Sequence, residues 1–280
     1  MGEQIMSKYL IFCFIITLIS LSFAQEINKS KLERGVNLIE TKVYSAEEDA
    51  EMLKLFEGLR VADVSDGMDM VGLVGTGLVD PVIHPDWADY KDLSHQFRGI
   101  AVTARYVPTQ RKDRPESDQE FKEWEGHFYN TYSSETFTTL IRPGTAIMLD
   151  DVEEKDIGSI GSYNILAWKK AGAVGVVTDA SSRDTDEIAI EKVPLYLRKK
   201  GRGIRPGRNE LESVNRPIVI GGVLVCPGDV VVADGDGVIV VPRYVAREVA
   251  KFARVILDKD KAGRKDLYES LGRPLDQTVK

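Results

Sequence analysis

Two charges of opposite sign follow a strand-like apolar run. Residues 172–180 read GAVGVVTDA, and after two serines come Arg183 and Asp184. An aspartate carboxylate is a hard oxygen ligand suited to Mg²⁺ or Mn²⁺, and an arginine can hold a carboxylate through two parallel hydrogen bonds. The pair therefore suits a small oxo acid bound beside a divalent cation. A purely structural role is equally open: Asp184 could cap a helix beginning at Thr185 while Arg183 forms a surface ion pair.

A second candidate element is the run Gly161-Ser162-Tyr163-Asn164, which opens a predicted helix. The free N–H groups and the positive end of the dipole at a helix start can hold a carboxylate or phosphate without any special side chain. Ser162 could also be a plain N-cap, a role that is compatible with anion binding at the same place.

The elements around these residues predict that they lie close together. RPGTAIMLDD, at 142–151, is typical of a turn followed by a strand. A helix follows from about Tyr163 to Lys170, and the strand GVVTD comes next. Such a succession is a βαβ unit with two parallel strands, and ligands of these units gather beyond the carboxyl ends of the strands. We therefore expect Asp150, Asp151, the Gly161 loop and the Arg183–Asp184 pair at that edge.

The rest of the chain predicts an α/β domain with a mixed sheet. Residues 97–108 alternate like a strand, and 109–141 form a polar, charged excursion that is expected to contain a helix. Asp236-Gly237 between valine-rich runs is a strong hairpin signal. Residues 25–60 favour helix, with an amphipathic stretch at 46–60, and a further amphipathic helix follows the hairpin.

Several common catalytic sites lack support. The three histidines, His84, His95 and His127, show no metal-ligand spacing and are expected at the surface or in caps. The chain has no GxSxG elbow, and Cys226 precedes Pro-Gly in a predicted hairpin, so a serine or cysteine nucleophile is not indicated. Asp234 and the following Asp-Gly are interpreted as turn residues, since valines occupy the later positions of a calcium loop.

Charge and the amino-terminal segment bear on partners and location. The formal net charge of -7 argues against a nucleic-acid partner. Lys8 precedes the apolar run YLIFCFIITLISLSF and then Ala24, which predicts a signal peptide at 1–24 and a protein exported to the periplasm or outside. The run is shorter than a stable membrane span requires. The mature chain would keep one cysteine and could form no internal disulfide.

Taken together, these residues resemble the RraA-like family, which includes the metal-dependent 4-hydroxy-4-methyl-2-oxoglutarate aldolases. The resemblance covers roughly Leu59 to Pro242, broken at 109–141. Its most specific parts are GSYNILAWKKAGAVGVVTDASSRDTDEI and IVIGGVLVCPGDVVVADGDGVIVVP. The chain departs from the family pattern at Ser162, where an acidic residue is usual, and at Ala180, where glycine is usual.

The resemblance implies a swivelling β/β/α fold, a homotrimer or homohexamer, and a site shared by adjacent subunits. It assigns Arg183 to the pyruvyl part of the substrate, Asp184 to Mg²⁺ or Mn²⁺, and the Gly161–Asn164 loop to the substrate carboxylate. The implied reaction is retro-aldol cleavage or decarboxylation of a small 2-oxo acid through a metal-stabilised pyruvate enolate.

Two other functions stay open at this point. One is a non-catalytic, carboxylate-binding or regulatory oligomer of the RraA type, and the other is an enzyme that acts on an oxidised sugar acid. The expected organisation is a signal peptide at 1–24, a helical extension at 25–58, the RraA-like α/β domain at 59–258 and a tail at 259–280.

Overall fold

The computed structural model describes residues 29–112, 115–152 and 155–280. The chain divides into two compact units, residues 1–40 and 41–280. The predicted signal peptide lies outside the described residues, and the described part of the first unit holds the short helix α2 (Lys29–Glu33). Across the described residues, no helix has the length and apolar composition that a membrane crossing requires.

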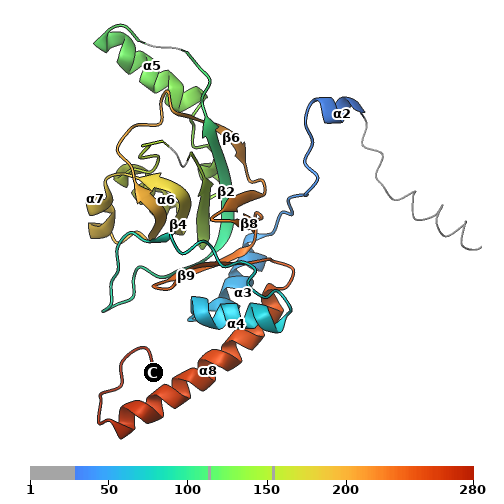
Figure 1. Cartoon of the computed structure of the whole chain (residues 1–280), viewed down its shortest axis with the longest axis vertical. Helices are drawn as coiled ribbons and strands as arrows, with labels where there is room; N and C mark the ends of the chain where they lie inside the picture. Colours follow the sequence, from blue (N-terminus) through green and yellow to red (C-terminus); the bar gives the residue numbers. More distant parts are fainter. Residues whose placement is uncertain (1–28, 113–114, 153–154) are drawn as a thin grey trace, which may run out of the picture. The chain divides into compact units, whose positions relative to one another are not determined.

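The second unit is built on a mixed sheet in the order β1-β5-β4-β3-β2-β9-β10, with β6 also paired to β2 (Figure 1). Its strands are β1 (His84–Pro85), β2 (Phe97–Pro108), β3 (Thr145–Asp150), β4 (Ala173–Ser182), β5 (Leu195–Lys200), β6 (Asn209–Val214), β9 (Val230–Asp234) and β10 (Gly237–Val241). The four central strands β2 to β5 run parallel, while β1, β6, β9 and β10 pair antiparallel to their neighbours. A separate two-stranded ribbon pairs β7 (Ile218–Ile220) with β8 (Val223–Val225).

Helices cover different parts of this sheet (Figure 1). They are α3 (Ala46–Phe56), α4 (Val61–Met70), α5 (Asp118–Thr131), the 3₁₀ helix η1 (Thr136–Leu140), α6 (Ser162–Ala171), α7 (Thr185–Ile190) and α8 (Ala246–Ser270). One apolar core joins α3, α4 and α8 to β9 and β10, and another joins α6 and α7 to β3, β4 and β5. A third core lies around β2, β9 and β10 together with the β7–β8 ribbon. The predicted α/β class is therefore confirmed.

Local sequence signals account for the βαβ unit and the hairpin. The unit β3-α6-β4 has parallel strands, as predicted, and α6 ends at Gly172, whose φ of 120° is readily available only to glycine. β9 and β10 form the predicted antiparallel hairpin, with Gly237 at φ 120° directly after the turn. The strand predicted at 97–108 is confirmed as β2, and the polar excursion contains α5.

The terminal helices differ from their predicted extents. The amino-terminal helical pattern is interrupted, because helix is present only at α2 and α3, and α3 begins at a capping box in which Ser45 and Glu48 bond each other's backbone. At the other end, the predicted amphipathic helix is confirmed as α8, which runs through Gly263 to Ser270 and so into the segment expected as a tail. The buried residues of α8 lie in its first half, and the helix packs on α4.

Candidate functional site

A pocket of about 390 Å³ lies at the carboxyl ends of β3 and β4. We call it the strand-end pocket. It is lined by Tyr129, Asn130, Glu135, Gly158, Ser159, Gly161, Asn164, Arg183 and Arg205. The expectation that the Gly161 loop and Arg183 meet at this edge of the sheet is thus met by the geometry.

Arg183 follows the last residue of β4 and is aimed across the loop that precedes α6. Its backbone N–H donates to the Ile160 carbonyl at 2.9 Å. Its aliphatic stem passes over Gly158, where a Cβ atom would lie only 2.6 Å from the Arg183 Cβ and 2.9 Å from its Cδ. The absence of a side chain at Gly158 therefore makes room for the arginine, and the side chain remains 38% exposed.

Asp184 adopts a left-handed backbone conformation, with φ of 58°. It occupies the N-cap position of α7, but its side chain makes no capping hydrogen bond there. Asp184 therefore does not cap α7 through its side chain, which was the predicted structural role. Instead Oδ2 accepts a hydrogen bond from the Ser162 N–H at 3.3 Å and lies 3.7 Å from Arg183 Nε. The carboxylate thus sits at the start of α6, where the free N–H groups and the dipole favour an anion.

The start of α6 is shaped by a glycine. Gly161 is its N-cap, and a Cβ atom at this position would lie 3.0 Å from Asp184 Oδ2. Of the four predicted loop residues, Gly161 and Asn164 line the pocket, and Ser162 contributes its N–H to Asp184. Tyr163 is 84% exposed and is not among the lining residues, because the helix turns its side chain outward.

These groups can be tested for their fit to a divalent cation. Among the described residues there is no group of three or more His, Cys, Asp or Glu side chains that could form a closed metal site. Mg²⁺ and Mn²⁺ do not require one, since Mg²⁺ is typically bound through one or two carboxylates and keeps several waters. Asp184 supplies a hard carboxylate that is 40% exposed and borders the space beside Gly161. The donor set therefore fits a hydrated Mg²⁺ or Mn²⁺ held by Asp184.

The polar excursion supplies a wall of the pocket that sequence reasoning missed. Glu135 accepts hydrogen bonds from Asn164 Nδ2 at 2.7 Å, Trp168 Nε1 at 3.1 Å and Arg205 Nη2 at 2.6 Å. Tyr129 lies under the Arg205 guanidinium, with 5.2 Å between the guanidinium carbon and the ring centre. No local motif marks these residues, which are brought together from positions far apart in the chain.

Arg205 is a buried cation, with 7% of its side chain exposed. Burial lowers its pKa, but the neighbouring Tyr106 and the Glu135 carboxylate outweigh burial, so its pKa is raised and it stays charged. Its Nη1 also donates to the Tyr106 hydroxyl at 3.0 Å. The strand-end pocket therefore holds one arginine paired inside the wall and a second, Arg183, that is half exposed.

The aspartates at the end of β3 stand apart from the pocket lining. Asp150 pairs with Arg105 at 3.2 Å, and burial raises its pKa. Asp151 is buried behind Ser159, where Oδ1 accepts from Asn209 Nδ2 at 2.7 Å. Its Oδ2 has no hydrogen-bond partner within the described structure, and burial raises the pKa of this carboxyl.

The remaining polar candidates take structural roles. His95 is buried, contrary to the expectation of a surface position, because Trp87 and Tyr90 pack around its ring and its Nδ1 accepts from the Asp89 N–H. His84 and His127 are exposed, as expected. Asp234 is the last residue of β9, and its carboxylate accepts from the Asp236 N–H in the hairpin turn and from the Val61 N–H at the start of α4, so it has the structural role that was expected.

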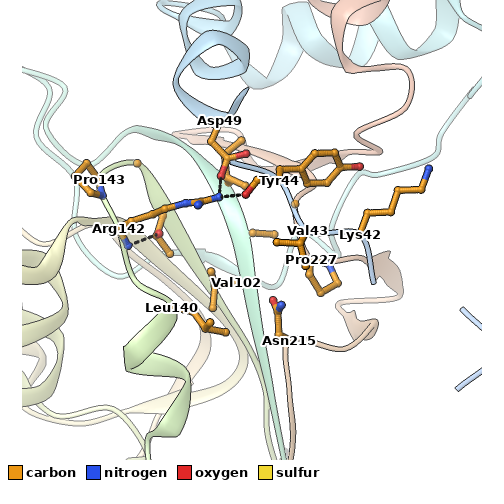
Figure 2. A pocket seen from close by; sticks show the side chains of 15 residues that line it. Lys42, Val43, Tyr44, Asp49, Val102, Leu140, Arg142, Pro143, Asn215 and Pro227 are labelled. Atoms are coloured by element: carbon orange, nitrogen blue, oxygen red, sulfur yellow. Dashed lines mark hydrogen bonds and ion pairs between the residues drawn. The ribbon is translucent and has the colours of Figure 1, made fainter. Parts of the chain in front are cut away.

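A second pocket, of about 120 Å³, lies at the opposite end of β3. We call it the strand-start pocket, and Figure 2 shows Arg142 directed at Asp49 across it. Arg142 Nη2 bonds Asp49 Oδ2 and the Tyr44 carbonyl, and Arg243 Nη1 bonds Asp49 Oδ1 at 2.8 Å. Asp49 is 6% exposed, and each of its carboxylate oxygens is bonded to a guanidinium group. Lys42 extends away from this cluster (Figure 2).

Comparison with known proteins gives one family and several relatives. The RraA-like family model, described as Aldolase/RraA, matches residues 61–240. A Halalkalibacterium halodurans protein with the provisional name 4-hydroxy-4-methyl-2-oxoglutarate aldolase is 28% identical over 130 residues, which are 46% of this chain and 61% of that protein. The Thermus thermophilus 4-hydroxy-4-methyl-2-oxoglutarate aldolase is 33% identical over 90 residues, 29% of this chain and 49% of that protein. The chain thus spans less than two thirds of the length of either curated relative.

Among solved structures, Streptomyces coelicolor RraAS2 superposes with a TM-score of 0.63 at 20% identity, over 78% of this chain and 98% of that chain. It is described as an unusual member of the RNase ES inhibitor RraA protein family. At this level of identity the similarity concerns the fold.

Proposed function

Because the chain belongs to the RraA-like family, we propose that it is a divalent-metal-dependent lyase that acts on a small 2-oxo acid. The observation that carries the proposal is that Asp184 lies against Arg183 and the start of α6, directly beside Gly161 and Arg183, which line the strand-end pocket. The aldolase names of two relatives point to the same reaction class.

Arg183, the start of α6 and Asp184 have separate roles in the proposed reaction. Arg183 presents a half-exposed guanidinium that can hold the carboxylate and oxo group of a pyruvyl unit by paired hydrogen bonds. The Ser162 N–H donates to Asp184, and the next N–H group of α6, at Tyr163, offers a further donor to the substrate carboxylate. Asp184 would hold Mg²⁺ or Mn²⁺, which when bound supplies positive charge that stabilises an enolate.

Neither proposed reaction needs a covalent bond between the enzyme and its substrate. In retro-aldol cleavage the C4 hydroxyl loses its proton to solvent, and its oxygen becomes the carbonyl of the departing fragment. The C3–C4 bond breaks, and its electron pair becomes the enolate of pyruvate. Protonation of the enolate at C3 releases pyruvate. Decarboxylation of oxaloacetate passes through the same enolate, with CO₂ as the leaving group. Arg183 and the α6 amides would bind the developing negative charge more strongly than the neutral ketone, which lowers the barrier.

Assembly and location belong to the same proposal. We infer a homotrimer or homohexamer whose sites are shared between subunits, and export directed by residues 1–24. The first rests on the family and the second on the apolar run after Lys8. The alternatives are a non-catalytic oligomer of the RraA type that binds a carboxylate and an enzyme acting on an oxidised sugar acid.

The test measures pyruvate release from 4-hydroxy-4-methyl-2-oxoglutarate and from oxaloacetate, with Mg²⁺, with Mn²⁺ and with EDTA. We expect activity that EDTA abolishes and that Asp184→Asn lowers by about 100-fold or more, since the variant removes the proposed anionic ligand. Asparagine is chosen because it tolerates the left-handed backbone at this position. No release from either substrate, or equal activity of the variant, rejects the lyase. Metal binding without turnover supports the non-catalytic alternative.

A further inference from the structure

The Asn164 side chain is fixed in the first turn of α6 by a carboxylate. Its Nδ2 donates to Glu135 Oε1 at 2.7 Å. A carboxylate can only accept hydrogen bonds, so the amide nitrogen must face Glu135 and the amide oxygen must face the other way. The orientation of this amide is therefore decided by its partner.

Glu135 is itself held firmly. Arg205 Nη2 donates to Oε1 at 2.6 Å, and Trp168 Nε1 donates to Oε2 at 3.1 Å. Arg205 is buried and balances the Glu135 charge, so Glu135 does not need a cation from the pocket. Its remaining effect on the pocket is to set the direction of Asn164.

The free oxygen of Asn164 shares a space with the carboxylate of Asp184. A Cβ atom at Gly161 would lie 3.6 Å from Asn164 Oδ1 and 3.0 Å from Asp184 Oδ2. Because position 161 is glycine, this space is left open, and two hard oxygen atoms from different elements border it. Arg183 Nε lies 3.8 Å from the same point, on the side where the substrate carboxylate is proposed to bind.

We propose that the amide oxygen of Asn164 is a second protein ligand of the divalent cation, beside Asp184, and that Glu135 is the residue that positions it. The inference rests on the proposed function, since it concerns the same cation. One carboxylate and one amide oxygen, completed by waters and substrate, form the hard-oxygen environment that Mg²⁺ and Mn²⁺ prefer. The amide oxygen adds a ligand without a second negative charge beside Asp184.

The experiment titrates the protein with Mn²⁺ alone and measures free Mn²⁺ by electron paramagnetic resonance, without substrate. Asn164→Leu is expected to weaken Mn²⁺ binding by about 10-fold or more, comparable to the loss of ligand support at other metal sites. Asn130→Leu is the matched control, because it removes an amide from the same pocket that is not among the three atoms nearest to a Cβ at position 161. The Mn²⁺ affinity of this variant should remain within about twofold of wild type.

A second variant tests the positioning role and guards against a misfolded Asn164→Leu protein. Asn164 and Arg205 donate to the same Glu135 oxygen, so a glutamine would keep an acceptor there; the double variant Glu135→Met/Arg205→Met instead removes this acceptor without leaving a buried charge unpaired, and the Asn164 amide can turn over. We expect a smaller loss of Mn²⁺ affinity with unchanged circular dichroism. Unchanged affinity in this double variant would overturn the positioning role.

The two proposals fail in different ways. If Asp184→Asn loses Mn²⁺ affinity while Asn164→Leu binds as wild type does, the metal site stands and the Asn164 ligand is rejected. If Asp184→Asn binds Mn²⁺ as tightly as wild type, the cation is not held by Asp184, and the metal-dependent function is rejected with it.

Discussion

At the two ends of strand β3, arginine and aspartate meet in opposite ways. In the strand-start pocket Asp49 is buried and both of its oxygens are bonded to guanidinium groups, from Arg142 and Arg243. At the other end, Arg183 of the strand-end pocket and the adjacent Asp184 are each more than a third exposed, and their nearest charged atoms are 3.7 Å apart. The first set is satisfied by the fold, whereas the second keeps hydrogen-bonding capacity for a ligand.

The difference shows that residue types alone do not mark a binding site. The buried Asp49 carboxylate links α3 to the arginines just before β3 and α8, and removing its charge leaves Arg243, which is also buried, without its countercharge. Arg183 and Asp184 form only an exposed ion pair of 3.7 Å at a helix start, and such charges can be completed by substrate and cation. The largest expected effects on stability therefore belong to the strand-start pocket, and the largest effects on activity belong to the strand-end pocket.

The comparison is tested most directly by making the same substitution, aspartate to asparagine, at both ends of β3. Asp49→Asn removes the countercharge of Arg142 and Arg243 and is expected to lower the free energy of unfolding by about 3 kcal/mol. Asp184→Asn is expected to change it by less than about 0.5 kcal/mol. Urea denaturation of the two variants checks this, and equal destabilisation would contradict the distinction.

The pH dependence of stability is a second contrast, and it centres on Asp229, whose Oδ1 accepts from the Arg243 N–H at 3.0 Å. Burial raises the pKa of Asp229 from 3.8 to about 6, although the N–H groups of Cys226 and Arg243 lower it. The folded state therefore keeps a proton that the unfolded state has lost between about pH 4 and 6. Proton binding by Asp229 therefore stabilises the folded state fully below pH 4. This stabilisation, about 2 to 3 kcal/mol in the free energy of unfolding, is lost as the pH rises through 6.

The measurement compares unfolding free energies of wild type and Asp229→Asn from pH 4 to 7. Asparagine cannot lose the proton, so the difference between the two proteins should change by that amount across the window and then level off. Parallel curves would show that Asp229 titrates alike in the folded and unfolded states.

The smallest effect is expected from Gly158→Ala, which pushes on the stem of Arg183. The added Cβ would lie 2.6 to 2.9 Å from the Arg183 side-chain carbons, so the guanidinium must move. We expect a fall in kcat/KM of about 10-fold, since misplacement of a binding group is costly in rate. Gly126→Ala, on α5 where an added Cβ meets nothing within 4 Å, is the control that should keep full activity. Equal rates in both variants would mean that Arg183 does not need its present position.

Part of the site could be predicted because its residues lie next to signals of local structure. Arg183 and Asp184 directly follow a valine-rich strand, and Gly161 opens a predicted helix, so the βαβ rule places both at one edge of the sheet. Glu135 and Arg205 could not be found in this way. They belong to a polar excursion and a later loop, and neither segment has a periodicity that fixes which face it turns inward.

The sequence by itself determined the elements and the family, because strand alternation, glycine stops and the Asp-Gly turn are encoded within a few residues of where they act. Only the tertiary structure decided which charges are already paired within the protein and which remain available to a ligand. Asp49 and Asp184 are both aspartates near arginines, and their difference comes from burial and from partners distant in the chain, such as Arg142 and Arg243. The same holds for Asn164, whose oxygen borders the space beside Gly161 that Asp184 also borders, because Glu135 holds its nitrogen.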